Sequence, residues 1–201
     1  MPDGTIRGKD GRVFKLAGLE LTDQGRAALP GLVENQTLIV RPVGRPDRWS
    51  RQAAHIDRVE ENLVLRGLGH AAAQAEGACL GPLLAAEAKA RAARVGVWSR
   101  RDFVIAAHDG KALTARLGHP IVAEGRVVST RAYQGRIYLN FARYWKTGLS
   151  LIIAEKDWPL LAGGVAENFV GRRLRVRGRL EYRAGPAIIA GPGDRIEVLG
   201  P

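Results

Sequence analysis

The chain of 201 residues carries 31 lysines and arginines against 20 acidic residues, a formal net charge of +11. A hydrophobic content of 46% and a charged content of 25% exclude wholesale disorder, and the length allows one large domain or two small ones. The basic balance favours a polyanionic partner such as nucleic acid or an anionic membrane surface, although a charge that serves only solubility is the alternative.

The first third of the chain alternates strand-like runs with a helical one. Residues 13–21 and 36–43 are rich in Val, Ile and Leu and are bounded by turn formers, so they predict strands, and 52–59 predicts a weaker third strand. Residues 22–35 are helical in pattern, but Pro30 followed by glycine predicts a short, broken helix.

Two further helices are expected before residue 100. Residues 60–71 predict a brief helix ended by Gly69. Residues 81–98 predict the strongest helix, because Pro82 suits its first turn, alanines and charged residues fill its middle, and Gly96 ends it. The expected apolar stripe of this helix consists of Leu83, Leu84, Ala88 and Ala92.

From about residue 119 the sequence pattern becomes typical of strands, after an expected connector at 101–118. The β-rich runs are 120–133, 135–144, 149–154, 172–182, 186–190 and 195–199, and only 155–169 is helical or irregular in pattern. Short strands with one helix after the third are typical of a small Greek-key barrel of the OB type. The sequence therefore predicts a mainly β protein of two OB-fold-like barrels in tandem, at residues 1–100 and 119–201.

Arginines recur at two places that could contact phosphates. Because side chains alternate along a strand, Arg173, Arg175, Arg177 and Arg179 are expected on one strand face, spaced about 7 Å apart, roughly like phosphates along a single strand. The alternative is a solvated face that balances an acidic neighbour. The segment "RPDRWSR" at 45–51 adds a second cluster, which includes Arg48 and Arg51.

Aromatic side chains gather in the segment that precedes this arginine-rich strand. The set is Tyr133, Tyr138, Phe141, Tyr144 and Trp145. Aromatic rings beside a basic groove can stack on bases, so Tyr138 and Trp145 are candidate nucleic-acid contacts. Burial of these rings in the barrel core is the alternative.

Several other functions have no support in the sequence. The four histidines and Cys79 lack metal-ligand spacing, and there is no phosphate-binding glycine loop or serine nucleophile motif. One cysteine excludes an internal disulfide framework. No run approaches the roughly 18 apolar residues that a membrane span needs. The N-terminus lacks a signal-peptide core, so the protein is expected to be cytoplasmic, or periplasmic or exported if a leader has been removed.

Four segments in order resemble the staphylococcal-nuclease-like (thermonuclease) domain. They are "FKLAGLELTD", "DRWSRQAAHI", "ENLVLRGLGHA" and "LLAAEAKARAARVGVW", and together they span nearly all of residues 4–98. The resemblance implies an OB barrel with helices and a calcium-dependent phosphodiesterase that cuts DNA and RNA. Residues 120–199 are similar, more loosely, to OB-type tails that follow such domains in some bacterial proteins.

The resemblance also implies a site that departs from the family pattern. The first arginine of the family falls on Lys15, its metal-binding aspartate on Glu20 and its general-base glutamate on Asp23, while its second arginine is kept at Arg51. Asp3 remains from an early metal-binding turn whose second aspartate is missing. Lysine lacks the planar fork of arginine, and a carboxylate displaced by about 1 Å can cost on the order of 100-fold in rate.

The sequence therefore predicts a nucleic-acid-binding protein with a degenerate, weakly active or inactive nuclease corner. The expected partner is single-stranded DNA or RNA, and Ca²⁺ is expected only if the protein is catalytic. After residue 100 the chain has sixteen basic and nine acidic residues, against fifteen and eleven before it. A calcium-dependent phosphodiesterase with a variant site and a protein-interaction scaffold remain as alternatives.

Overall fold

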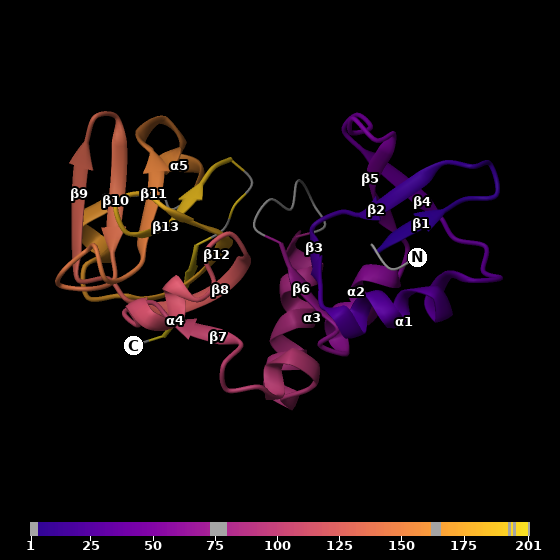
Figure 1. The fold of residues 1–201 in the computed structure, drawn as a ribbon, viewed down its shortest axis with the longest axis horizontal. Helices are drawn as coiled ribbons and strands as arrows, with labels where there is room; N and C mark the ends of the chain where they lie inside the picture. The colour runs from indigo at the N-terminus through magenta and orange to yellow at the C-terminus, as the bar shows by residue number, and fades with distance from the viewer. Residues whose placement is uncertain (1–3, 73–79, 162–165, 193, 195, 201) are drawn as a thin grey trace. The chain divides into compact units, whose positions relative to one another are not determined.

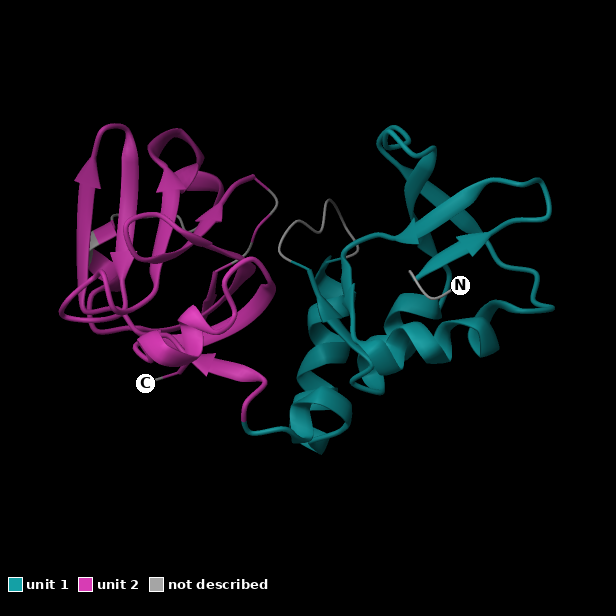
Figure 2. Cartoon of the chain, viewed as in Figure 1, with its two compact units in different colours: residues 1–101 teal, residues 102–201 magenta. Residues whose placement is uncertain are grey.

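The computed structural model describes residues 4–72, 80–161, 166–192, 194 and 196–200. The chain divides into two compact units, residues 1–101 and 102–201 (Figure 2). The chain as a whole is mainly β with several helices, as the sequence predicts; most of its strand residues lie in the second unit, whereas the first unit combines short strands with longer helices. The segment 101–118, expected as a connector, instead supplies a strand and a helix to the second unit.

The first unit is built on a four-stranded sheet in the order β1-β2-β5-β4 (Figure 1). These strands are β1 (Thr5–Arg7), β2 (Val13–Leu16), β5 (Arg51–Ile56) and β4 (Val40–Val43). β2 and β5 run parallel, and the other neighbours are antiparallel. The run 13–21 divides at Gly18, whose φ of 67° turns the chain from β2 into β3 (Leu19–Leu21). β3 pairs with β6 (Gly69–Ala71) in a separate ladder.

Among its described residues, the first unit has three α-helices and a 3-10 turn, η2 (Gly96–Ser99). α1 (Asp23–Val33) begins at Thr22, whose hydroxyl accepts the Gly25 amide hydrogen at 2.9 Å. The expected break at Pro30 is wrong: the helix continues to Val33, because the ring of Pro30 removes only one hydrogen bond and the Glu34 amide still reaches the Pro30 carbonyl at 2.9 Å. α2 (Val59–Leu65) ends earlier than expected, and Gly69 lies in β6.

The long helix α3 (Leu80–Ala93) confirms the strongest helix prediction, but it buries a different face. Leu83 is buried as expected, whereas Ala88 and Ala92 are exposed. The buried face includes Glu87, which is fully buried and accepts the Ala71 amide hydrogen at 2.9 Å. A buried carboxylate therefore joins α3 to β6. The core of this unit consists of Phe14, Leu16, Leu19, Leu29, Ile56, Leu63, Val64, Leu80 and Leu83 with their neighbours.

The second unit is built on one sheet in the order β7-β8-β12-β13-β11-β10-β9, with β14 added beside β12. The strands are β7 (Val104–Ala106), β8 (Pro120–Arg126), β9 (Ser129–Tyr133), β10 (Arg136–Asn140), β11 (Ser150–Ala154), β12 (Arg173–Tyr182), β13 (Pro186–Ala190) and β14 (Glu197–Val198). The path is open at β7 and β9, so the sheet is not a closed barrel. Strands therefore occupy all six β-rich runs, and β7 is an addition that the sequence did not suggest.

Short helices pack on this second sheet. They are α4 (Gly110–Thr114), α5 (Trp158–Leu161) and the 3-10 turns η3 (Glu155–Asp157) and η4 (Ala166–Phe169). The ring of Trp158 meets that of Phe169 edge to face, with centroids 5.3 Å apart. Gly178 is required inside β12, because its φ is 152° and a Cβ there would lie 2.6 Å from Cγ2 of Ile188.

Candidate nucleic-acid interface

An exposed tryptophan between two arginines lies at the turn before β5. We call residues 47–51 the Trp49 turn. The Trp49 side chain is 59% exposed. The guanidinium carbons of Arg48 and Arg51 lie 3.9 and 4.6 Å from the centroid of its ring. Two cations over one indole form a surface that suits both the phosphates and the bases of a nucleic acid.

Asp47 fixes this turn. Its carboxylate accepts the amide hydrogens of Trp49 at 2.9 Å and of Arg51 at 3.0 Å, and it also accepts the Arg51 Nε hydrogen at 3.0 Å. Desolvation opposes ionisation of Asp47, but the hydrogen bonds from Arg51 and Trp49 outweigh it and lower the pKa of this carboxyl. Ser50 adopts a φ of 58° in the same turn. The Trp49 turn is therefore held in one shape before any ligand arrives.

The two cationic residues of the expected catalytic corner lie on neighbouring strands. Arg51 opposes Val13 in the parallel β2–β5 ladder, and Lys15 opposes Ala53 two residues further along. Because side chains alternate along a strand, Lys15 and Arg51 belong to one face of the sheet. Lys15 is exposed, whereas Arg51 is half-buried by its ion pair with Asp47.

The acidic residues of that corner lie on other elements. Glu20 is in β3, where it opposes His70. Asp23 begins α1, and its side chain is 98% exposed and pairs with Arg26 at 2.8 Å. Asp3 lies outside the described residues. Among the residues that the structure describes, no three histidine, cysteine or acidic side chains gather in a way that could hold a metal ion.

Two buried carboxylates in the first unit have structural partners. Glu60 accepts the Ile56 amide hydrogen at 2.9 Å and lies 3.3 Å from Nδ1 of His55. Burial raises the pKa of Glu60, although the Ile56 amide and His55 oppose this shift. Glu87 pairs with Arg91 as well as with the Ala71 amide. These carboxylates join elements of the fold and do not face an open site.

The arginine row of β12 binds carboxylates of its own unit. Arg175 and Arg177 are buried. Arg175 pairs with Glu124 of β8 at 2.6 Å and with Glu197 of β14 at 3.2 Å, and Arg177 also pairs with Glu197. The ladders explain this, because both glutamates stand opposite Arg175. Arg175 and Arg177 therefore neutralise acidic neighbours, which is the alternative interpretation of the row given above.

The two ends of the row are more accessible. The Arg173 side chain is 54% exposed, although it pairs with Glu124 at 2.8 Å. Arg179 is also exposed, and within the described part of the chain no carboxylate pairs with it. Only these two of the four arginines therefore present a guanidinium group to solvent.

The aromatic set is divided between core and surface. Phe141 is buried in the core, and Tyr138 is half-buried in β10 opposite Arg131 of β9. Trp145 is 41% exposed, and Nζ of Lys146 lies 5.5 Å from its ring centroid. Tyr133 and Tyr144 are also exposed, and Arg131 lies over the Tyr133 ring.

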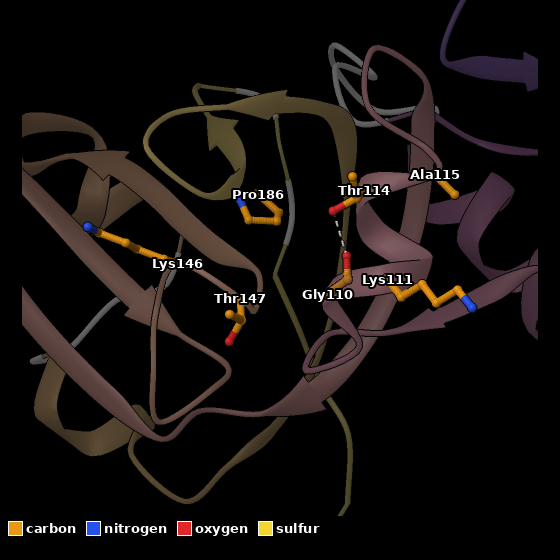
Figure 3. Close-up of a pocket in the computed structure, with 7 residues that line it drawn as sticks. All are labelled: Gly110, Lys111, Thr114, Ala115, Lys146, Thr147 and Pro186. Carbon is orange, nitrogen blue, oxygen red and sulfur yellow. Dashed lines mark hydrogen bonds between the residues drawn. The ribbon is translucent and has the colours of Figure 1, made fainter.

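A pocket of about 700 Å³ opens in the second unit (Figure 3). It is lined by Gly110, Lys111, Thr114, Ala115, Lys146, Thr147 and Pro186. These residues come from α4, from the loop between β10 and β11, and from the start of β13. No sequence motif marks them, because three segments distant in the chain build the pocket.

No protein-family model matches the chain, and no curated protein is significantly similar to it. Among the described residues, no helix is both long enough and apolar enough to cross a membrane.

Proposed function

We propose that this protein binds single-stranded or otherwise flexible nucleic acid. The observation that carries the proposal is the Trp49 turn, where two guanidinium carbons lie 3.9 and 4.6 Å from the centroid of an exposed indole and Asp47 fixes the backbone. Stacking of a base on an aromatic ring contributes about 1–3 kcal/mol, and a flanking cation attracts the adjacent phosphate. The net charge of +11 supports the same class of partner.

The proposal includes a fold assignment for each unit. For the second unit, an OB-like assignment is supported by the parallel β11–β13 pair and by the antiparallel β9–β10–β11 and β12–β13 ladders. β8 and β9 are separated by only Val127 and Val128, so one stretch of chain pairs with β12 and then with β10. For the first unit, the four ordered segments that resemble the staphylococcal-nuclease-like domain support that assignment.

The proposal treats the nuclease-like corner as degenerate. Lys15 and Arg51 share a sheet face, which is the observation that favours a variant calcium-dependent phosphodiesterase as the second candidate. Two observations weigh against efficient cleavage. Asp23 is almost fully exposed beside Arg26, and Arg51 is engaged by Asp47. A general base needs a fixed position beside the reacting atoms and a phosphate-binding cation needs free donors, and an exposed carboxylate and a paired guanidinium do not meet these needs.

Fluorescence anisotropy with labelled oligonucleotides tests the proposed function. We expect submicromolar binding of single strands at low salt, and we expect the logarithm of the affinity to fall linearly with the logarithm of the salt concentration. A duplex of the same length serves as the comparison. Absence of salt-dependent binding to single strands below micromolar protein would exclude the proposal.

A further inference from the structure

The pocket of the second unit has walls that the backbone fixes. A Cβ added to Gly110 would lie 2.1 Å from the Thr147 carbonyl oxygen, so α4 packs directly on the loop between β10 and β11. A Cβ on Gly185 would lie 3.0 Å from Cα of Lys146 and 3.1 Å from the Trp145 carbonyl oxygen. The loop before β13 therefore also touches this segment. The volume of the pocket, about 700 Å³, falls within the range of roughly 300–1,000 Å³ that is usual for ligand sites.

Two lysines give this pocket its charge. Lys111 and Lys146 are exposed, and in the described part of the chain neither forms an ion pair with a carboxylate. Figure 3 shows their side chains extending in opposite directions, away from the space between them, so the ammonium groups do not converge on the pocket. Cations placed in this way suit two separate charges of an extended polyanion better than a single phosphate.

The space between the lysines suits an aromatic or sugar group. Ala115 and Pro186 present apolar surface there. The Thr114 hydroxyl donates to the Gly110 carbonyl at 2.7 Å and the Thr147 hydroxyl donates to the Tyr144 carbonyl at 2.9 Å. Each hydroxyl has used its hydrogen, so its oxygen can only accept a hydrogen bond from a ligand.

An exposed indole neighbours one of the two lysines of the pocket. Trp145 precedes Lys146, and its ring lies 5.5 Å from the Lys146 ammonium group. A ring that is 41% exposed beside a cation can stack on a base while the cation contacts the neighbouring phosphate. Trp145 is not among the residues that line the pocket, but its ring lies beside the ammonium group of Lys146, which is.

We infer that this pocket is a second nucleic-acid contact, separate from the Trp49 turn, which holds one nucleotide of a single strand. The strand leaves the pocket in two directions, Lys111 and Lys146 contact its phosphates on the two sides, and Trp145 stacks on a base that lies outside the pocket. The inference rests on the proposed function, because it names the single-strand contact of the second unit.

The test uses the full-length chain and a labelled oligothymidylate in anisotropy titrations at several salt concentrations. Lys111→Gln combined with Lys146→Gln should weaken binding about tenfold and reduce the salt slope by about 1.4, because each single-strand phosphate contact contributes about 0.7. Trp145→Ala should weaken binding about 5- to 150-fold, and Trp145→Phe should weaken it less. Lys156→Gln, at an exposed lysine of η3 that does not line the pocket, is the matched control.

The outcomes separate this inference from the proposed function. Selective loss in the pocket variants, with wild-type binding in Lys156→Gln and unchanged thermal unfolding, supports the pocket. If the wild type binds and the pocket variants match Lys156→Gln, the pocket inference is wrong and the proposed function stands. If the wild type itself does not bind, the proposed function and the pocket inference both fail.

Discussion

The guanidinium carbon of Arg48 lies 3.9 Å from the centroid of the Trp49 ring, and the Trp49 side chain is 59% exposed. The cation–π contact orients the two side chains, and both are exposed to solvent. This contact is the basis of the first prediction.

Trp49→Ala should weaken single-strand binding about 5- to 150-fold, because stacking of a base on an aromatic side chain contributes about 1–3 kcal/mol. Trp49→Phe keeps an aromatic ring and should retain most of the affinity. The free energy of unfolding should change by less than about 0.5 kcal/mol, since the side chain is exposed. Anisotropy and denaturant titration measure the two effects. Equal affinities of Trp49→Ala and the wild type would contradict a role for the Trp49 turn.

Glu197→Ala should destabilise the second unit by about 3 kcal/mol, because it leaves the buried guanidinium of Arg177 without this carboxylate. Glu181→Ala is the control, since its ion pair with Arg183 is exposed and should contribute no more than about 1 kcal/mol. Urea unfolding measures the stability of each variant, and hydrogen exchange of the β12 amides shows whether the loss is local to that strand. If Glu197→Ala lowers the free energy of unfolding no more than the control does, the buried ion pair contributes little to stability.

Asp194 should make the stability of the second unit depend on pH. Burial raises the pKa of Asp194 to about 6, although the Gly191 amide hydrogen bond opposes the shift. Oδ1 of this carboxyl is buried, and among the described atoms it has no hydrogen-bond partner. Because the folded-state pKa lies above the unfolded value of 3.8, the folded state binds more protons between pH 4 and 6. The contribution of Asp194 is full below about pH 4 and is lost as pH rises through 6.

Asp194→Asn removes this titration. The stability of the wild type relative to Asp194→Asn should therefore fall from pH 4 to pH 7. Urea unfolding of both proteins at several pH values between these limits measures the difference. A constant difference across that range would show that the carboxyl titrates in the same way in the folded and unfolded chains.

Calcium should not activate efficient cleavage. Incubation of the protein with single-stranded DNA, in calcium or in chelator, should give equal and slow degradation, because Asp23 is exposed and paired with Arg26. Gel analysis of the products measures this. Calcium-dependent cleavage that disappears in Asp23→Ala would instead favour the phosphodiesterase.

Strand periodicity and glycine positions predicted most of the secondary structure. The runs that became β10, β11, β12 and β13 are bounded by turn residues, so their ends could be found from local sequence. β7 could not be found, because the three residues Val104–Ala106 form a strand only by pairing with β8. The buried face of α3 was also missed, since Glu87 faces inward to reach the Ala71 amide. A local pattern carries no information on such a partner.

In the candidate sites, too, the sequence did not reveal which distant residues come into contact. The Arg48 to Arg51 cluster was visible as charge in the sequence, but the contacts of both guanidinium groups with the Trp49 ring were not. Alternation correctly placed Arg175 and Arg177 on one face of β12, yet their partners come from β8 and β14. Phosphate binding and internal neutralisation produce the same arginine spacing, so sequence alone could not choose between them.

The hydrophobic clusters of the two units share no residue among those described. Each unit therefore has a hydrophobic interior of its own, and we expect a substitution in one interior to destabilise mainly that unit. Cutting the gene between the codons for Arg101 and Asp102 should yield two separately expressible polypeptides, so that contributions to ligand capture can be assigned to one half at a time.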